Sequence, residues 1–130
     1  MDLAQFTPAT WIGASLALVI ALGIIFVGIS YLASPIPTAR GFGFTSAITP
    51  EVTPWLHVKG PRDIVSGLVI LAMLVFFGPA AAAVILLVEA LTPTGDALTI
   101  LRNHGRLAVA LGVHALTAAV MVVAAVLLLL

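Results

Sequence analysis

Residues 9–33 form an unbroken stretch that carries no charged side chain. As a helix, this stretch of 25 residues would be about 37 Å long at 1.5 Å per residue, enough to cross a bilayer with some tilt. Trp11 and Tyr31 lie near its two ends, where aromatic residues gather in membrane helices. The stretch therefore predicts a transmembrane helix over about 9–33.

Charged residues are scarce in the whole chain, at 8% against 62% hydrophobic residues. A soluble domain has about a quarter charged residues, so this chain could not cover its own surface in water. We therefore expect the lipid bilayer to be its main solvent. The chain has no Cys, which excludes thiolate chemistry. Its net charge of zero excludes nucleic acid as an expected partner.

Three further apolar segments predict helices over about 62–77, 80–101 and 107–130. We place the start of the second helix at Pro61 or Arg62, because Pro suits the first helical position. The third helix would be only about 18 Å long if it stopped at Leu91, before Pro93. We therefore expect it to continue through a kink, since neighbouring groups satisfy freed carbonyls in membrane helices.

Residues 34–60 contain several prolines, glycines and aromatic residues and predict a loop at the level of the lipid headgroups. Within this loop, a Thr followed by Pro suggests one short helix near 50–58. The sequence as a whole predicts an all-α fold: one integral membrane domain over 1–130, built as a four-helix transmembrane bundle.

The connection between the first and second spans and the connection between the third and fourth spans lie on the same side of the membrane, because two spans separate them. All basic residues fall in or beside these two connections: Arg40, Lys59, Arg62, Arg102 and Arg106. Cytoplasmic loops carry an excess of Lys and Arg. We therefore predict cytoplasmic long loops and extracytoplasmic termini. The membrane would be a bacterial inner membrane or a eukaryotic endomembrane.

The ionisable residues inside the predicted helices should gather, because an isolated charge in the bilayer costs at least about 2.5 kcal/mol. The turn positions place Arg62 and Asp63 level with Asp96, and His114 between the levels of Asp96 and Glu89. We favour an ion pair between Arg62 and Asp96. Glu89 has no basic residue at its level, so we expect it to be protonated or to share a proton with His114.

These residues have structural and functional interpretations. Lys59 and Arg62 either hold a helix end at the headgroups or, with Arg40, bind the polar head of a ligand. Asp63 could cap its helix or join that ligand site. The candidate catalytic residues are Glu89, Asp96 and His114, although Asp96 could be only a structural ion-pair partner. No ligand spacing predicts a metal site, and no cofactor is expected.

Several short motifs together resemble a family of small four-span integral membrane proteins of bacteria and fungi whose function is unknown. These motifs are Ala39-Arg40-Gly41-Phe42-Gly43, Lys59-Gly60-Pro61-Arg62-Asp63-Ile64-Val65-Ser66-Gly67, Gly95-Asp96-Ala97 and His114. The resemblance implies four helices and importance for Arg40, Arg62, Asp63, Asp96 and His114. Pro61 departs from the pattern, where an aliphatic residue is expected. The size and plan are also loosely similar to DoxX-like proteins, sterol isomerases and transmembrane terpene cyclases.

The sequence leads to two hypotheses about function. The first is a pocket for a small lipophilic molecule, formed around a buried charged cluster that could perform acid–base catalysis. Isomerisation, cyclisation or epoxide opening would fit, because none of them needs a cofactor. The alternative is a small proton-coupled carrier or a non-catalytic subunit of a membrane complex. A carrier would need a homodimer, for which we consider one small-residue face of the first helix: Gly13, Ala17, Ala21 and Gly28.

Overall fold

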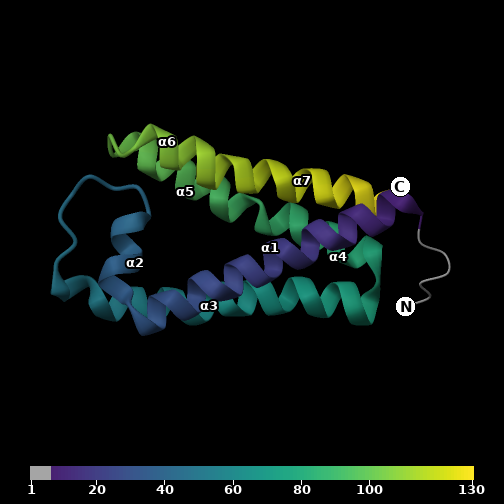
Figure 1. Ribbon diagram of the computed structural model, residues 1–130, viewed down its shortest axis with the longest axis horizontal. Coiled ribbons are helices and arrows are strands. Elements are labelled where there is room, and N and C mark those ends of the chain that lie inside the picture. The colour runs from purple at the N-terminus through teal and green to yellow at the C-terminus, as the bar shows by residue number, and fades with distance from the viewer. Residues whose placement is uncertain (1–6) are drawn as a thin grey trace.

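The computed structural model describes residues 7–130 as an all-helical bundle, with no strand in that part of the chain (Figure 1). Four helices in it are long and apolar enough to cross a membrane: Pro8–Ala33, Pro50–Phe77, Pro79–Arg102 and Leu107–Leu129. A short fifth helix, α2 (Pro35–Gly41), follows the first of them. The four-helix prediction is therefore confirmed, and the protein is an integral membrane protein.

The first span is the single helix α1 (Pro8–Ala33), as predicted. The Thr7 hydroxyl accepts a hydrogen bond from the Thr10 backbone N–H at 3.1 Å, which caps its start. Gly13 lies against the backbone of Leu128, near the end of the chain. The first turns of α1 and the last turns of the chain therefore lie at one end of the bundle, which we call the terminal end (Figure 1).

The second span begins earlier than predicted. It comprises η2 (Pro50–Val52), α3 (Thr53–Ala72) and the π-helical η3 (Met73–Phe77). Pro61 therefore lies inside the helix, and the predicted start at residue 62 is wrong. The predicted short helix near 50–58 is the first part of this span, so the loop expected over 34–60 is reduced to residues 42–49, after α2.

Packing against α1 explains why the helix continues through Pro61, which cannot donate a helical hydrogen bond. A Cβ on Gly60 would lie 2.9 Å from the Gly28 carbonyl oxygen, and one on Gly67 would lie 2.5 Å from that of Ala21. The two backbones thus touch on both sides of the proline, as small residues permit in membrane helices. This contact involves residues far apart in sequence and outweighs the local effect of one proline.

The third span is interrupted but not ended, which confirms the predicted kink. It consists of α4 (Pro79–Glu89) and α5 (Leu91–Arg102), which join at Ala90. Pro93 has no N–H for the Glu89 carbonyl four residues earlier, and this missing bond accounts for the interruption. The fourth span comprises α6 (Leu107–Val109), the π-helical η4 (Ala110–Ala115) and α7 (Leu116–Leu129).

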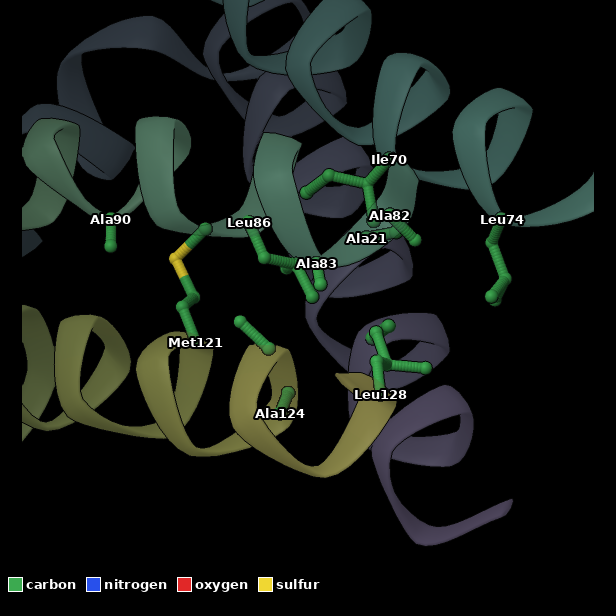
Figure 2. Close-up of a cluster of buried hydrophobic side chains, with 12 residues drawn as sticks. Ala21, Ile70, Leu74, Ala82, Ala83, Leu86, Ala90, Met121, Ala124 and Leu128 are labelled. Carbon is green, nitrogen blue, oxygen red and sulfur yellow. The ribbon is translucent and has the colours of Figure 1, made fainter. Parts of the chain in front are cut away.

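The hydrophobic core lies toward the terminal end, where α1, α3, α4 and α7 meet (Figure 2). Its largest fully buried side chains are Ile70, Leu86 and Met121, and most of the others are alanines. The small residues of α1 considered for a dimer contact are buried within the chain itself: Gly13, Ala17, Ala21 and Gly28. A homodimer stays a prediction, and it would have to use another surface.

Candidate functional site: a cavity with ionisable lining residues

We call the end of the bundle opposite the termini the loop end. There, Lys59 and Asp63 form an ion pair on one face of α3. The Lys59 Nζ lies 2.8 Å and 2.7 Å from the two Asp63 carboxylate oxygens. Residues four apart lie on the same face of a helix, which brings the two side chains together. The Nζ also lies 5.1 Å from the centre of the Tyr31 ring and 5.9 Å from that of Phe42. Both distances fit a cation–π contact, so aromatic rings partly enclose the cation.

A second pair joins the third and fourth spans. The His114 Nδ1 lies 3.6 Å from the Asp96 carboxylate, and its Nε2 lies 3.1 Å from the Phe42 carbonyl oxygen. A carbonyl oxygen only accepts, so Nε2 must carry a hydrogen in this contact. A neutral ring then has no hydrogen on Nδ1. The contact with Asp96 is therefore favourable when one proton is held by either the ring or the carboxyl group.

The loop after α2 is fastened to the turn between the third and fourth spans, and this fixes Phe42. The Arg106 backbone N–H donates to the Gly43 carbonyl at 2.8 Å. The Arg106 guanidinium donates to the Arg40 and Gly41 carbonyls at 3.0 Å and 3.3 Å. Gly43 has φ of 123°, a conformation that side chains rarely permit. We call these contacts the Arg106 clasp.

These groups line a partly open cavity of about 530 Å³ between α1, α3, the third span and the fourth span. Its ionisable lining residues are Lys59, Asp63, Glu89, Asp96 and His114. The rest of the lining is mainly apolar. Val19 of α1 and Leu116 of α7 line the cavity and are also 68% and 56% exposed on the outer surface. They lie at its margin, so in a membrane the opening between these helices would face lipid.

The structure brings together five of the seven residues predicted for the site and leaves out Arg40 and Arg62. Arg62 is exposed and has no side-chain partner within residues 7–130. The predicted ion pair between Arg62 and Asp96 is wrong, because His114 contacts Asp96 instead. Adjacent helical positions point about 100° apart. Arg62 therefore cannot share the face of Asp63, which Lys59 does share.

The predicted buried charged cluster also needs correction. No charged side chain of the described residues is fully buried, and those of the cavity are partly accessible through its opening. The sequence analysis missed the cavity roles of Tyr31 and Phe42, which it treated as interfacial aromatics. The Arg40-Gly41-Phe42-Gly43 motif was the available signal, because a flexible Gly on either side of an aromatic residue suits a precisely placed loop. Within residues 7–130, no three His, Asp or Glu side chains lie close enough to hold a metal ion.

The fold and this cavity define the protein as a four-span helical membrane protein with ionisable groups facing a shared interior space. The model of the DUF4267 family, a domain of unknown function, matches residues 21–128, and the chain belongs to this family. The predicted resemblance to a family of unknown function is thus confirmed, and this chain has four helices long and apolar enough to cross a membrane. No curated protein and no solved structure matches the chain. The looser similarity to DoxX-like proteins, sterol isomerases and terpene cyclases is not shown.

Proposed function

We propose that the protein binds a small lipophilic molecule in the cavity and exchanges a proton with it through Asp96 and His114. One observation carries this proposal. The chain has five Lys and Arg, five Asp and Glu, and three His residues, and five of these thirteen line a single cavity. Ionisable residues in membrane spans are costly and most often mark a functional site.

The shape of the cavity supports a lipophilic ligand. Ligand sites are typically about 300–1,000 Å³ in volume and mainly apolar, with a few polar groups that set orientation. The cavity is about 530 Å³, has ionisable groups along an otherwise apolar wall, and has exposed apolar residues at its margin. A molecule dissolved in the bilayer could thus enter sideways and place a polar group near Asp96 and His114.

The paired contacts support proton exchange. The Phe42 carbonyl oxygen accepts a hydrogen bond from the His114 Nε2. A proton that reaches a ligand would therefore come from the other side of the ring, between Nδ1 and Asp96. Lys59 and Asp63 would orient the polar part of the ligand, and Glu89 is a further acid on the same wall. Isomerisation, cyclisation and epoxide opening each need a positioned proton and no cofactor, so these reaction types fit best.

The binding part can be tested by native mass spectrometry of protein purified in mild detergent. Gly23 lines the cavity, and a Cβ there would meet no atom within 4 Å. We expect wild type to retain one small molecule and Gly23→Phe to lose it. Gly95→Phe is the matched control, because Gly95 is equally open but lies outside the cavity lining. Wild-type protein without any retained molecule would contradict the proposal.

The proton-exchange part can be tested by incubating the protein and its retained molecule in D₂O. We expect the wild type to incorporate deuterium at a carbon atom of the molecule, where exchange needs a catalyst, and Asp96→Asn and His114→Ala to lose this incorporation. Arg62→Gln should behave like wild type, since Arg62 lies outside the cavity lining. Equal incorporation in all four proteins would remove Asp96 and His114 from the chemistry.

The same pairs could serve a proton-coupled carrier, which is the second candidate. The observation in its favour is that the Asp96 carboxylate and the His114 Nδ1 lie 3.6 Å apart in the lining of a partly open cavity. Proton-dependent flux of the retained molecule into vesicles, without its chemical conversion, would favour the carrier. Co-purification of a second protein at fixed stoichiometry would instead favour an accessory subunit.

We also propose that the loop end, with all five basic residues, faces the cytoplasm. The turn between α5 and α6, which contains His104, lies at that end, and the C-terminus lies at the terminal end (Figure 1). The chain has no cysteine, so single cysteines can be introduced at both positions. An impermeant thiol reagent on intact cells should label Leu130→Cys and leave His104→Cys unlabelled. The opposite pattern would reverse the orientation.

A further inference from the structure

Glu89 is the one ionisable group of the cavity that has no partner. It lies at the end of α4, is half-buried and lines the cavity. No side chain of the described residues donates a hydrogen bond to its carboxylate or forms an ion pair with it. In the third span, Pro93 also deprives the Glu89 carbonyl of its helical donor. The side-chain carboxylate and the backbone carbonyl of Glu89 thus both lack their usual hydrogen-bond donors.

The charges of the cavity balance without Glu89. Lys59 and Asp63 neutralise each other through their two short contacts. Asp96 and His114 with one proton between them are also neutral as a pair. An ionised Glu89 would therefore leave the cavity with a net charge of −1, because Lys59 is the only Lys or Arg in its lining. A cationic ligand would supply the missing partner.

We propose that Glu89 binds the ammonium group of a lipophilic amine, so that the cavity selects cationic over anionic lipophiles. This inference rests on the proposed ligand-binding function and names the chemical class of its ligand. The amine N–H groups would donate to the Glu89 carboxylate, and the hydrocarbon part would lie along the apolar wall. A carboxylate or phosphate ligand would meet uncompensated negative charge there, since Lys59 is already bound by Asp63.

The test uses three probes of equal chain length: decylamine, decanol and decanoate at pH 7.5. Their binding to the full-length protein in nonionic detergent is measured by native mass spectrometry. We expect wild type to bind decylamine at least tenfold more tightly than decanoate. Glu89→Gln should lose most of that preference and still bind decanol as wild type does, which also shows that its cavity is intact.

Glu51→Gln is the matched control, because Glu51 is exposed and lies outside the cavity lining. Glu89→Asp keeps the charge and should keep part of the preference. If no probe binds to wild type, both this inference and the cavity function fail. If all three probes bind equally, the cavity function stands and the amine inference is overturned. An amine preference that persists in Glu89→Gln also overturns it.

Discussion

The two ends of the bundle consist of similar apolar helices, but they differ in how these helices pack. At the terminal end, α1, α3, α4 and α7 meet through alanines and a few larger side chains, and twelve residues form a buried cluster there (Figure 2). At the loop end, α1 diverges from α7 and lies along α3 (Figure 1). The cavity occupies the space left between them, with its walls carrying the ionisable groups.

This difference separates the buried apolar core from the ionisable groups along the length of the bundle. Lipid tails are as apolar as leucine, so helices in a membrane associate through close packing rather than through the hydrophobic effect. The terminal end provides that packing. The loop end keeps the close contact between α1 and α3, but around the cavity it satisfies its polar groups through side-chain pairs and the Arg106 clasp. Substitutions should therefore have their largest effects on stability at the terminal end.

The largest expected effect is truncation of a core side chain, Leu86→Ala. Leu86 is fully buried between α4 and α7, so its loss leaves a cavity that costs about 2–4 kcal/mol. Its neighbour Leu87 is 43% exposed toward lipid, and Leu87→Ala should cost less than about 1 kcal/mol. Reversible unfolding in sodium dodecyl sulfate measures both. Equal losses would show that Leu86 is no more tightly packed than its exposed neighbour.

The next effect tests the contact between α1 and α3 through Gly67→Ala. The added Cβ would lie 2.5 Å from the Ala21 carbonyl oxygen, so the helices must separate at a cost of about 1–3 kcal/mol. Gly95→Ala is the control, because its Cβ meets nothing within 4 Å. That helical site should gain about 0.5–1 kcal/mol. Changes in the free energy of unfolding, relative to wild type, that have the same sign for both variants would contradict the structure.

The packing of α1 on α3 also shows what local sequence rules could and could not predict. Length and hydropathy were sufficient to predict the four spans. The minimum length of a membrane helix was sufficient to predict that the third span continues through a kink at Pro93. The start of the second span was misplaced because Pro61 is a strong local signal. Its tolerance depends on Gly28 and Gly60, which lie 32 positions apart in the sequence. No local pattern reports such a contact.

For the cavity, turn positions predicted that Arg62, Asp63, Glu89, Asp96 and His114 face one interior, and all of them except Arg62 line the cavity. The turn positions could not predict the pairing, which depends on rotation about each helix axis. The π-helical η4, which contains His114, changes that rotation by inserting a wider turn. Connection lengths carry no information about such a turn.

A smaller effect is expected from the ion pair at the loop end. Lys59→Met leaves Asp63 without a partner and should cost about 1–2 kcal/mol, since the pair is only partly buried. The double variant Lys59→Met with Asp63→Leu should be more stable than the single one, because no unpaired charge remains. Unfolding measurements on both variants, on Asp63→Leu and on wild type form a double-mutant cycle. Additive costs would mean that the pair does not contribute as a unit.

The smallest effect should come from Arg106→Ala, and it tests how the loop end is closed. This change removes two hydrogen bonds from an exposed guanidinium to the Arg40 and Gly41 carbonyls, worth about 0.5–1.5 kcal/mol in total. The loop that places Phe42 against His114 would loosen. We therefore expect faster amide hydrogen exchange across residues 41–44, with little change in the core.

Arg102→Ala is the matched control for this prediction, because it removes the same charge from the same turn. The Arg102 side chain is exposed and has no partner among the described residues. Faster exchange in Arg106→Ala alone would assign the closure to the specific hydrogen bonds of the clasp. Similar exchange in both variants would mean that positive charge at the loop end, rather than the clasp, holds the loop over the cavity.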